Sequence, residues 1–190
     1  EVAKAKPETP PASATADLLG QYRSANDNIT RVTLKDGFLY WQMDNNNPRK
    51  LLPVEGNLYR WEWDEHMQVA FYHDSDPTKR HYVLYEKGEQ AEKHQKLAPF
   101  SPTSVYLQNC AGRYFSTELG MGFEIRLSPE GQLLLKRDGV NYDTKVEVLQ
   151  ARDLLASDYK LRLEQDAKGQ IKAILLTYNR VKNLRFEKTK

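Results

Sequence analysis

The sequence predicts an all-β protein made of two tandem eight-stranded antiparallel β-barrels, and three observations lead to this prediction. The phrase Gly-x-Tyr-x-Ser occurs at residues 20–24 and again at residues 112–116. Further residues recur at a constant offset of 92: Val69, Phe71, Asp74 and Leu84 match Leu161, Leu163, Asp166 and Leu176. Short alternating runs are separated by turn residues at spacings of roughly eight to twelve residues, which is typical of antiparallel sheets.

We expect a flexible Pro/Ala-rich linker over residues 1–16 and a first, aromatic-rich barrel over residues 17–98. The linker segment contains three prolines and almost no residue suited to a core. Such a linker suggests an upstream neighbour, either another domain or a lipid anchor. Strand-like runs follow near residues 19–24, 29–35, 38–43, 49–54, 57–63, 67–73, 80–86 and 92–97. The last run is polar, so a loop or a helical turn is an equal alternative there.

Residues 99–106 form the expected connector, and residues 107–190 the expected second barrel. Two prolines bracket Phe100 in the connector, which favours an extended chain. In the second copy, Phe123, Ile125 and Leu127 alternate with polar residues, as in a sheet with one dry face. Single helical turns fit only residues 109–116 and 153–159. An antiparallel sheet of about eight strands closes most readily into a barrel, because closure removes its exposed edges.

Composition argues against several classes of protein. The 28 basic and 26 acidic residues leave a net charge of +2 with no basic block, so we expect no nucleic-acid partner. No apolar run reaches the roughly 18 residues of a membrane-spanning helix. Cys110 is the only cysteine, which rules out an intrachain disulfide and a thiolate metal site. We expect no cofactor.

The chain contains one motif with the form of a catalytic signature, Ser157-Asp158-Tyr159-Lys160, which spells Ser-x-x-Lys. That chemistry needs a helix to bring the lysine to the serine, whereas this tetrad runs into an alternating strand. No Tyr-x-Asn or Lys-Thr-Gly follows to complete a site, so we predict no catalytic residue.

The four histidines also fail to form a predicted metal site. They are His66, His73, His81 and His94, with spacings of 7, 8 and 13. These spacings match no standard ligand pattern, so we predict no metal ligand among them.

Aromatic residues concentrate in the first copy, which holds all three tryptophans. In residues 59–63, the aromatics at 59, 61 and 63 share one face of a strand, and Arg60 and Glu62 take the other. Aromatic faces suit stacking against a ligand or partner, but they also suit a barrel core, and both interpretations stay open. The candidate ligand-binding residues are Tyr40, Trp41, Tyr59, Arg60, Trp61, Trp63, Tyr72 and His73.

Three segments of the second copy resemble a known pattern: residues 111–119, 166–169 and 181–188. The chain is similar there to the small lipocalin-like β-barrel at the C-terminus of β-lactamase-related serine hydrolases, such as D-aminopeptidases and other penicillin-binding-protein-like peptidases. The resemblance implies lipocalin-like barrels without catalytic residues, which pack on a hydrolase domain. It also implies a bacterial protein that is periplasmic or secreted. This chain departs from the family in lacking the hydrolase.

These features favour a non-catalytic accessory or binding module. Its partner is expected to be an upstream serine-hydrolase domain, or a small envelope-derived ligand or peptide. A free-standing small-ligand-binding lipocalin-like protein is the first alternative. A hydrolase with a site in the first barrel is the second, and a dimer formed by the exposed aromatics is the third. The sequence leaves the ligand and the oligomeric state open.

Overall fold

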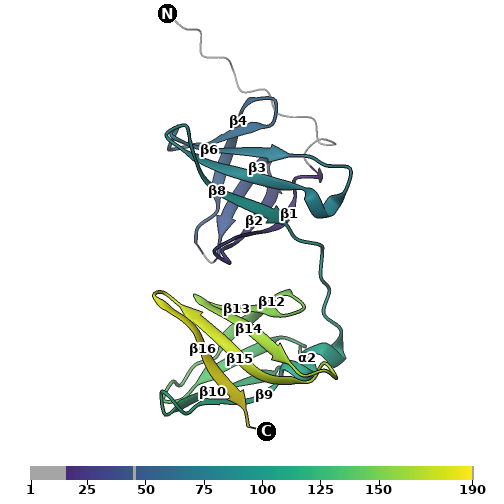
Figure 1. Cartoon of the computed structure of the whole chain (residues 1–190), viewed down its shortest axis with the longest axis vertical. Coiled ribbons are helices and arrows are strands. Elements are labelled where there is room, and N and C mark those ends of the chain that lie inside the picture. Colours follow the sequence, from purple (N-terminus) through teal and green to yellow (C-terminus); the bar gives the residue numbers. More distant parts are fainter. Residues whose placement is uncertain (1–15, 45, 190) are drawn as a thin grey trace, which may run out of the picture. The chain divides into compact units, whose positions relative to one another are not determined.

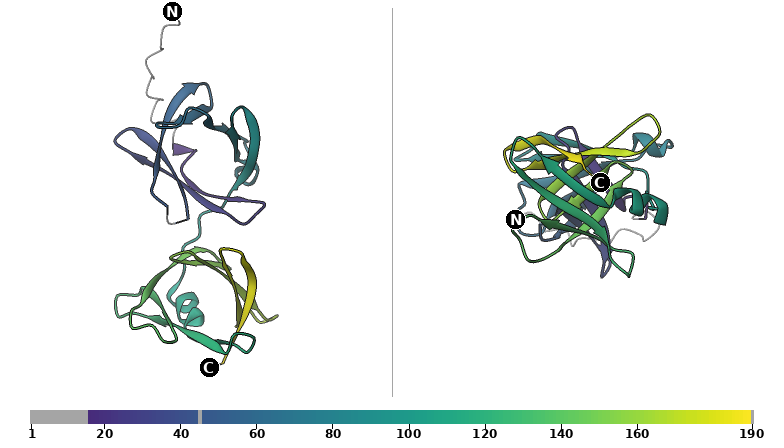
Figure 2. Two further views of the ribbon diagram at one scale, coloured as in Figure 1. Left: turned by 90° about the vertical axis from the view of Figure 1, so that its left-hand side faces the viewer. Right: turned by 90° about the horizontal axis from the view of Figure 1, so that it is seen from below.

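The computed structural model describes residues 16–44 and 46–189 and divides the chain into two compact units, between Pro99 and Phe100. Each unit contains a closed barrel of eight antiparallel strands, which confirms the predicted fold class (Figure 1). The ring of strands in each unit is visible in the left view of Figure 2. The predicted linker, residues 1–16, lies outside the described residues except for its last residue.

In the first barrel every strand pairs with the next one along the chain, and the last pairs with the first. The strands are β1 (Gly20–Ser24), β2 (Ile29–Lys35), β3 (Phe38–Met43), β4 (Arg49–Glu55), β5 (Leu58–Trp61), β6 (Met67–Tyr72), β7 (His81–Glu86) and β8 (Glu89–Lys96), with a short 3-10 turn η1 (Pro77–Lys79) after β6. The polar segment that the sequence left undecided is strand β8. It buries only His94, and its pairing with β7 and β1 closes the barrel.

The second barrel repeats this order and follows a short helix. Its elements are α2 (Ser104–Cys110), β9 (Gly112–Ser116), β10 (Met121–Leu127), β11 (Leu133–Arg137), β12 (Thr144–Gln150), β13 (Asp153–Ala156), β14 (Tyr159–Gln165), β15 (Ile171–Tyr178) and β16 (Val181–Lys188). The helix begins inside the predicted connector, residues 99–106. Thr103 caps its start by accepting a hydrogen bond from the Tyr106 N–H at 3.2 Å. The turn expected over residues 153–159 is instead strand β13 followed by a tight turn at Ser157.

The repeated Gly-x-Tyr-x-Ser phrase makes the same contacts in both barrels. The buried Tyr22 hydroxyl donates to the Leu18 carbonyl at 2.7 Å, and the buried Tyr114 hydroxyl donates to the Cys110 carbonyl at 2.8 Å. A lysine ammonium lies over each ring: Lys96 over Tyr22 at 5.9 Å, and Lys188 over Tyr114 at 5.7 Å. Each tyrosine therefore ties the chain that enters the barrel to the strand pair that closes it.

The strand registers show which interior positions correspond in the two barrels. Tyr22 lies opposite Thr30, as Tyr114 lies opposite Phe123, and the comparison extends from strand to strand around each ring. At five equivalent positions, the first barrel has a polar or large aromatic residue and the second has an apolar one. These pairs of equivalent residues are Thr30 and Phe123, Trp41 and Leu135, Trp61 and Ala156, Tyr82 and Ile174, and His94 and Phe186. The fold is thus filled in two chemically different ways.

The paired tyrosine bonds lead to a matched prediction. Tyr22→Phe and Tyr114→Phe each remove one buried hydroxyl and leave its carbonyl acceptor unpaired, so each should cost about 1 kcal/mol of the free energy of unfolding. The loss should fall on the unit that carries the change, and calorimetric unfolding measures it. Tyr142→Phe, at a side chain that is 69% exposed, is the control and should change nothing. Equal stability of all three variants and the parent protein would show that the bonds do not stabilise the barrels.

Candidate functional site

One end of the first barrel gathers its three tryptophans around an arginine, and we call Trp41, Arg49, Trp61 and Trp63 the tryptophan end. Trp41 on β3 and Trp61 on β5 are buried inside the barrel, and Trp63 lies just beyond β5 with 60% of its surface exposed. The ring centroids of Trp41 and Trp61 are 5.2 Å apart, and those of Trp61 and Trp63 are 5.5 Å apart. The three rings thus run from the core to solvent.

Arg49 points toward this aromatic row. It lies directly opposite Trp41 in the sheet and two residues before the buried Leu51, so its side chain is on the inner face of the barrel at the mouth. Its guanidinium carbon lies 5.0 Å from the Trp61 ring centroid and 4.6 Å from that of Trp63. Both distances are within cation–π range. The structure gives Arg49 no ion pair with any described residue.

Trp61 contributes an unused hydrogen-bond donor to the same place. Its side chain is only 8% exposed, and its Nε1–H has no hydrogen-bond partner among the described residues. The neighbouring Trp41 Nε1–H, in contrast, donates to the Tyr82 hydroxyl at 2.8 Å. A buried N–H without an acceptor costs about 1–3 kcal/mol, so an arriving acceptor would be stabilised there.

Behind the tryptophans, a chain of polar contacts continues through the barrel interior. The Tyr82 hydroxyl also shares a hydrogen bond with Thr30 Oγ1 at 2.6 Å. The Tyr82 ring stacks on His94 with centroids 4.5 Å apart. His94 Nε2 in turn lies 2.9 Å from Glu92 Oε2. The second barrel has apolar residues at the positions of Thr30, Tyr82 and His94, so its fold does not require this network.

The protonation states of His94 and Glu92 follow from burial and hydrogen bonding. Burial lowers the pKa of His94, and the nearby Glu92 charge only partly opposes this. Burial alone would raise the pKa of Glu92, but hydrogen bonds from Ser24 and Asn26 and the His94 charge bring it below its usual value. At neutral pH the carboxylate is therefore ionised and accepts from the Nε2–H of a neutral His94. Nδ1 then carries a lone pair, without a hydrogen-bond partner among the described residues.

The structure brings only part of the predicted ligand-binding set together. Trp41, Trp61 and Trp63 meet at the tryptophan end, whereas Tyr59 packs edge-on against Phe71 inside the barrel, with centroids 5.5 Å apart. Of the adjacent pair at 40 and 41, the tryptophan faces inward and Tyr40 lies half-buried on the outer wall.

The remaining predicted residues lie on the outside of the first barrel. Arg60 donates to the Trp61 carbonyl at 3.2 Å, and Tyr72 stacks on His81 with centroids 4.9 Å apart. His73 is exposed just after β6. Arg49 is not among the predicted residues, although its spacing from the apolar residue at 51 was a signal for an inward side chain.

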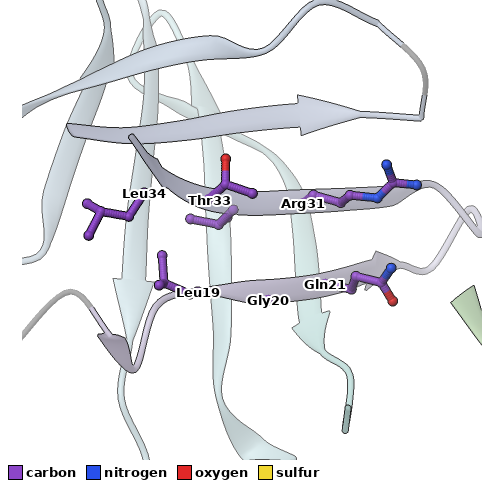
Figure 3. Close-up of a pocket in the computed structure, with 7 residues that line it drawn as sticks. Leu19, Gly20, Gln21, Arg31, Thr33 and Leu34 are labelled. Atoms are coloured by element: carbon purple, nitrogen blue, oxygen red, sulfur yellow. The ribbon is translucent and has the colours of Figure 1, made fainter. Parts of the chain in front are cut away.

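A depression lies along β1 and β2. It is an open groove of about 400 Å³, lined by Leu19, Gly20, Gln21, Arg31, Val32, Thr33 and Leu34. Figure 3 shows Leu19 and Leu34 at one end of this groove and Gln21 and Arg31 at the other. None of the predicted ligand-binding residues lines it, and it presents no aromatic ring to stack against.

Other chemistries have little support in the described part of the chain. No group of three or more His, Cys, Asp and Glu residues is placed to hold a metal ion there. Ser157 lies in a turn with φ of 53°, and Lys160 lies on β14. Within the same residues, none of the helices has the length and apolar character needed to cross a membrane.

Comparisons with known proteins add little. No protein-family model matches the chain, and no curated protein matches it either. One similar solved structure is a protein of unknown function from the DUF3598 family of Nostoc punctiforme, at 10% identity and a TM-score of 0.27, with 93% of this chain and 98% of that chain covered. A TM-score this low supports no conclusion about the fold or function of this protein.

The buried His94 predicts an acid-sensitive first barrel. Below a pH of about 6.5 the unfolded chain takes up a proton that folded His94 resists, because its pKa is lowered. The free energy of unfolding should therefore fall as the pH drops from about 7.5 to 5.5, and His94→Phe should flatten this dependence. Calorimetry over this range tests it. The second barrel serves as an internal control, since all four histidines lie in the first half. Parallel pH curves for the parent protein and the variant would contradict the prediction.

Proposed function

We propose that this protein is a non-catalytic binding module that takes a small ligand at the tryptophan end of the first barrel. The observation that carries the proposal is the ring of Trp63, which is 60% exposed at a barrel mouth beside a second tryptophan and an arginine. Covering such a ring removes a large apolar surface from water, and stacking adds about 0.5–1.5 kcal/mol beyond this burial.

The proposed ligand sits at the mouth of the barrel, because side chains fill the interior behind it. Trp41 and Tyr82 are almost fully buried and hydrogen-bonded to each other. A barrel of eight strands has room for side chains or for one small ligand, and here large rings occupy that space. The second barrel, filled mainly by aliphatic residues with Tyr114, Phe123 and Phe186, has a supporting role in this proposal.

We extend the proposal to the cellular context on the strength of the motif resemblance. Residues 111–119, 166–169 and 181–188 resemble barrels that accompany β-lactamase-related serine hydrolases. We therefore propose an accessory role beside such a hydrolase in a periplasmic or secreted bacterial protein. The gene sequence upstream of the Glu1 codon tests this part. A Ser-x-x-Lys hydrolase domain encoded there supports the accessory role, and its absence favours a free-standing ligand-binding protein.

A titration followed by tryptophan fluorescence tests the binding site. Peptidoglycan fragments, D-amino-acid peptides and fatty acids form the panel, and we expect at least one class to change the emission. Trp63→Ala should weaken that binding about tenfold, which corresponds to about 1.4 kcal/mol, while Trp41 and Trp61 still report it. Tyr72→Ala is the matched control, because Tyr72 is 40% exposed on the outer wall. No response to any member of the panel, or equal losses in both variants, argues against the site.

A further inference from the structure

We infer that the ligand bound at the tryptophan end carries a carboxylate, which pairs with Arg49 and accepts a hydrogen bond from Trp61 Nε1–H. This inference rests on the proposed function and specifies its ligand class. It depends on three features of the barrel mouth: an inward arginine, a buried donor without an acceptor, and acidic groups that are already engaged.

Arg49 has no anionic partner in the described part of the chain, so its charge is available to an anion of the ligand. Arg49 lies on the inner face of β4, and no described residue forms an ion pair with it. Its contacts with Trp61 and Trp63 use the ring faces. A guanidinium carries its N–H donors in its own plane, so contact with aromatic faces leaves donors free for a two-point bond to a carboxylate. The second barrel has Thr144 at this position and closes in the same register.

The indole adds a fixed donor next to this charge. Trp61 is more than nine-tenths buried, its Nε1–H has no acceptor among the described residues, and its ring lies 5.0 Å from the Arg49 guanidinium carbon. An indole N–H and a guanidinium only donate. The complementary group is therefore one that only accepts, as an ionised carboxylate does with its two oxygens. A hydroxyl or amide would leave its own donors to be satisfied elsewhere.

The acidic residues near this end have partners of their own. Glu92 is bound by His94 at 2.9 Å and by the Asn26 side chain at 3.2 Å. Glu62 pairs with Lys50 at 3.3 Å, and Asp64 accepts from the His66 backbone N–H at 3.0 Å. Each of these carboxylates thus already accepts from a neighbouring group, and Glu62 pairs with a cation. A single negative charge suits one arginine and one indole donor better than a phosphate dianion, which needs more donors.

The test compares two probes that differ only at one terminal group, which is a carboxylate in N-benzoyl-D-alanine and a neutral amide in its primary amide. Both are titrated into the full chain near neutral pH, by tryptophan fluorescence and by calorimetry. We expect the acid to bind at least tenfold more tightly than the amide, a difference of about 1.4 kcal/mol. The preference should shrink as salt is added, because the ion pair is partly open to water. Octyl phosphate, tested alongside, should bind more weakly than octanoate.

Three variants assign the preference to its residues. Arg49→Gln should bring the ratio of acid to amide affinity close to one while the amide still binds. Trp61→Phe keeps a ring but removes the N–H, and should lower the ratio severalfold. Lys35→Gln is the charge-matched control, since Lys35 is exposed at the end of β2. If Arg49→Gln fails to fold, Arg49→Lys keeps the charge without the planar fork and should give an intermediate ratio.

The outcomes separate the two proposals. Equal binding of acid and amide to the parent protein overturns the carboxylate inference and leaves the binding site in place. A preference for the acid that survives Arg49→Gln, or that Lys35→Gln removes, also overturns it. Tighter binding of octyl phosphate than of octanoate would replace the ligand class. Absence of binding by every probe contradicts the proposed site as well as the inference.

Discussion

Both units depend on closure of the hydrogen-bonded ring of strands. The closing pairs are short: β1 meets β8 over three residue pairs, and β9 meets β16 over two. At each closure a buried tyrosine hydroxyl and a lysine ammonium bind backbone carbonyls of the chain that enters the barrel. These contacts stabilise the short pairing that closes each ring. A closed barrel has no free strand edge, so recognition is limited to the outer wall and the two ends.

Closure also fixes which side chains point inward, and the two barrels use those positions differently. The second is filled mainly by aliphatic side chains, with Tyr114, Phe123 and Phe186 as its buried aromatics, and the small Ala156 occupies the place of Trp61. The first buries Thr30, Tyr82 and His94. Hydrogen bonds join Tyr82 to Thr30 and Trp41, and His94 stacks on the Tyr82 ring and contacts Glu92 through Nε2. Burying polar groups is costly unless they are hydrogen-bonded, which explains why these residues are in contact.

The sequence predicted the strands well wherever apolar and polar residues alternate at positions that recur in both copies. Such alternation arises from the two-residue period of a sheet, and a repeated fold places it at the same positions in both copies. It left β8 undecided, since that strand is polar and is held in the sheet by its pairing with β7 and β1. It also placed no helix over α2, whose seven residues are too few to show a helical period. For the site, spacing predicted that Trp61 and Trp63 share a face. Trp41 was also predicted as a candidate, but spacing could not place it beside them and did not predict Arg49. Both residues reach the same mouth through the pairing of β3 with β4.

The comparison between barrels separates what the fold needs from what the site needs. A barrel of this register closes with threonine and alanine at the positions of Arg49 and Trp61, as the second unit shows. An inward arginine without an ion pair in the described chain and a buried indole N–H without an acceptor both cost stability in the first unit. Folding therefore does not account for them. Both groups are hydrogen-bond donors, and the Arg49 guanidinium carbon lies 5.0 Å from the Trp61 ring beside the exposed Trp63. An acidic ligand that stacks there would account for all of them together.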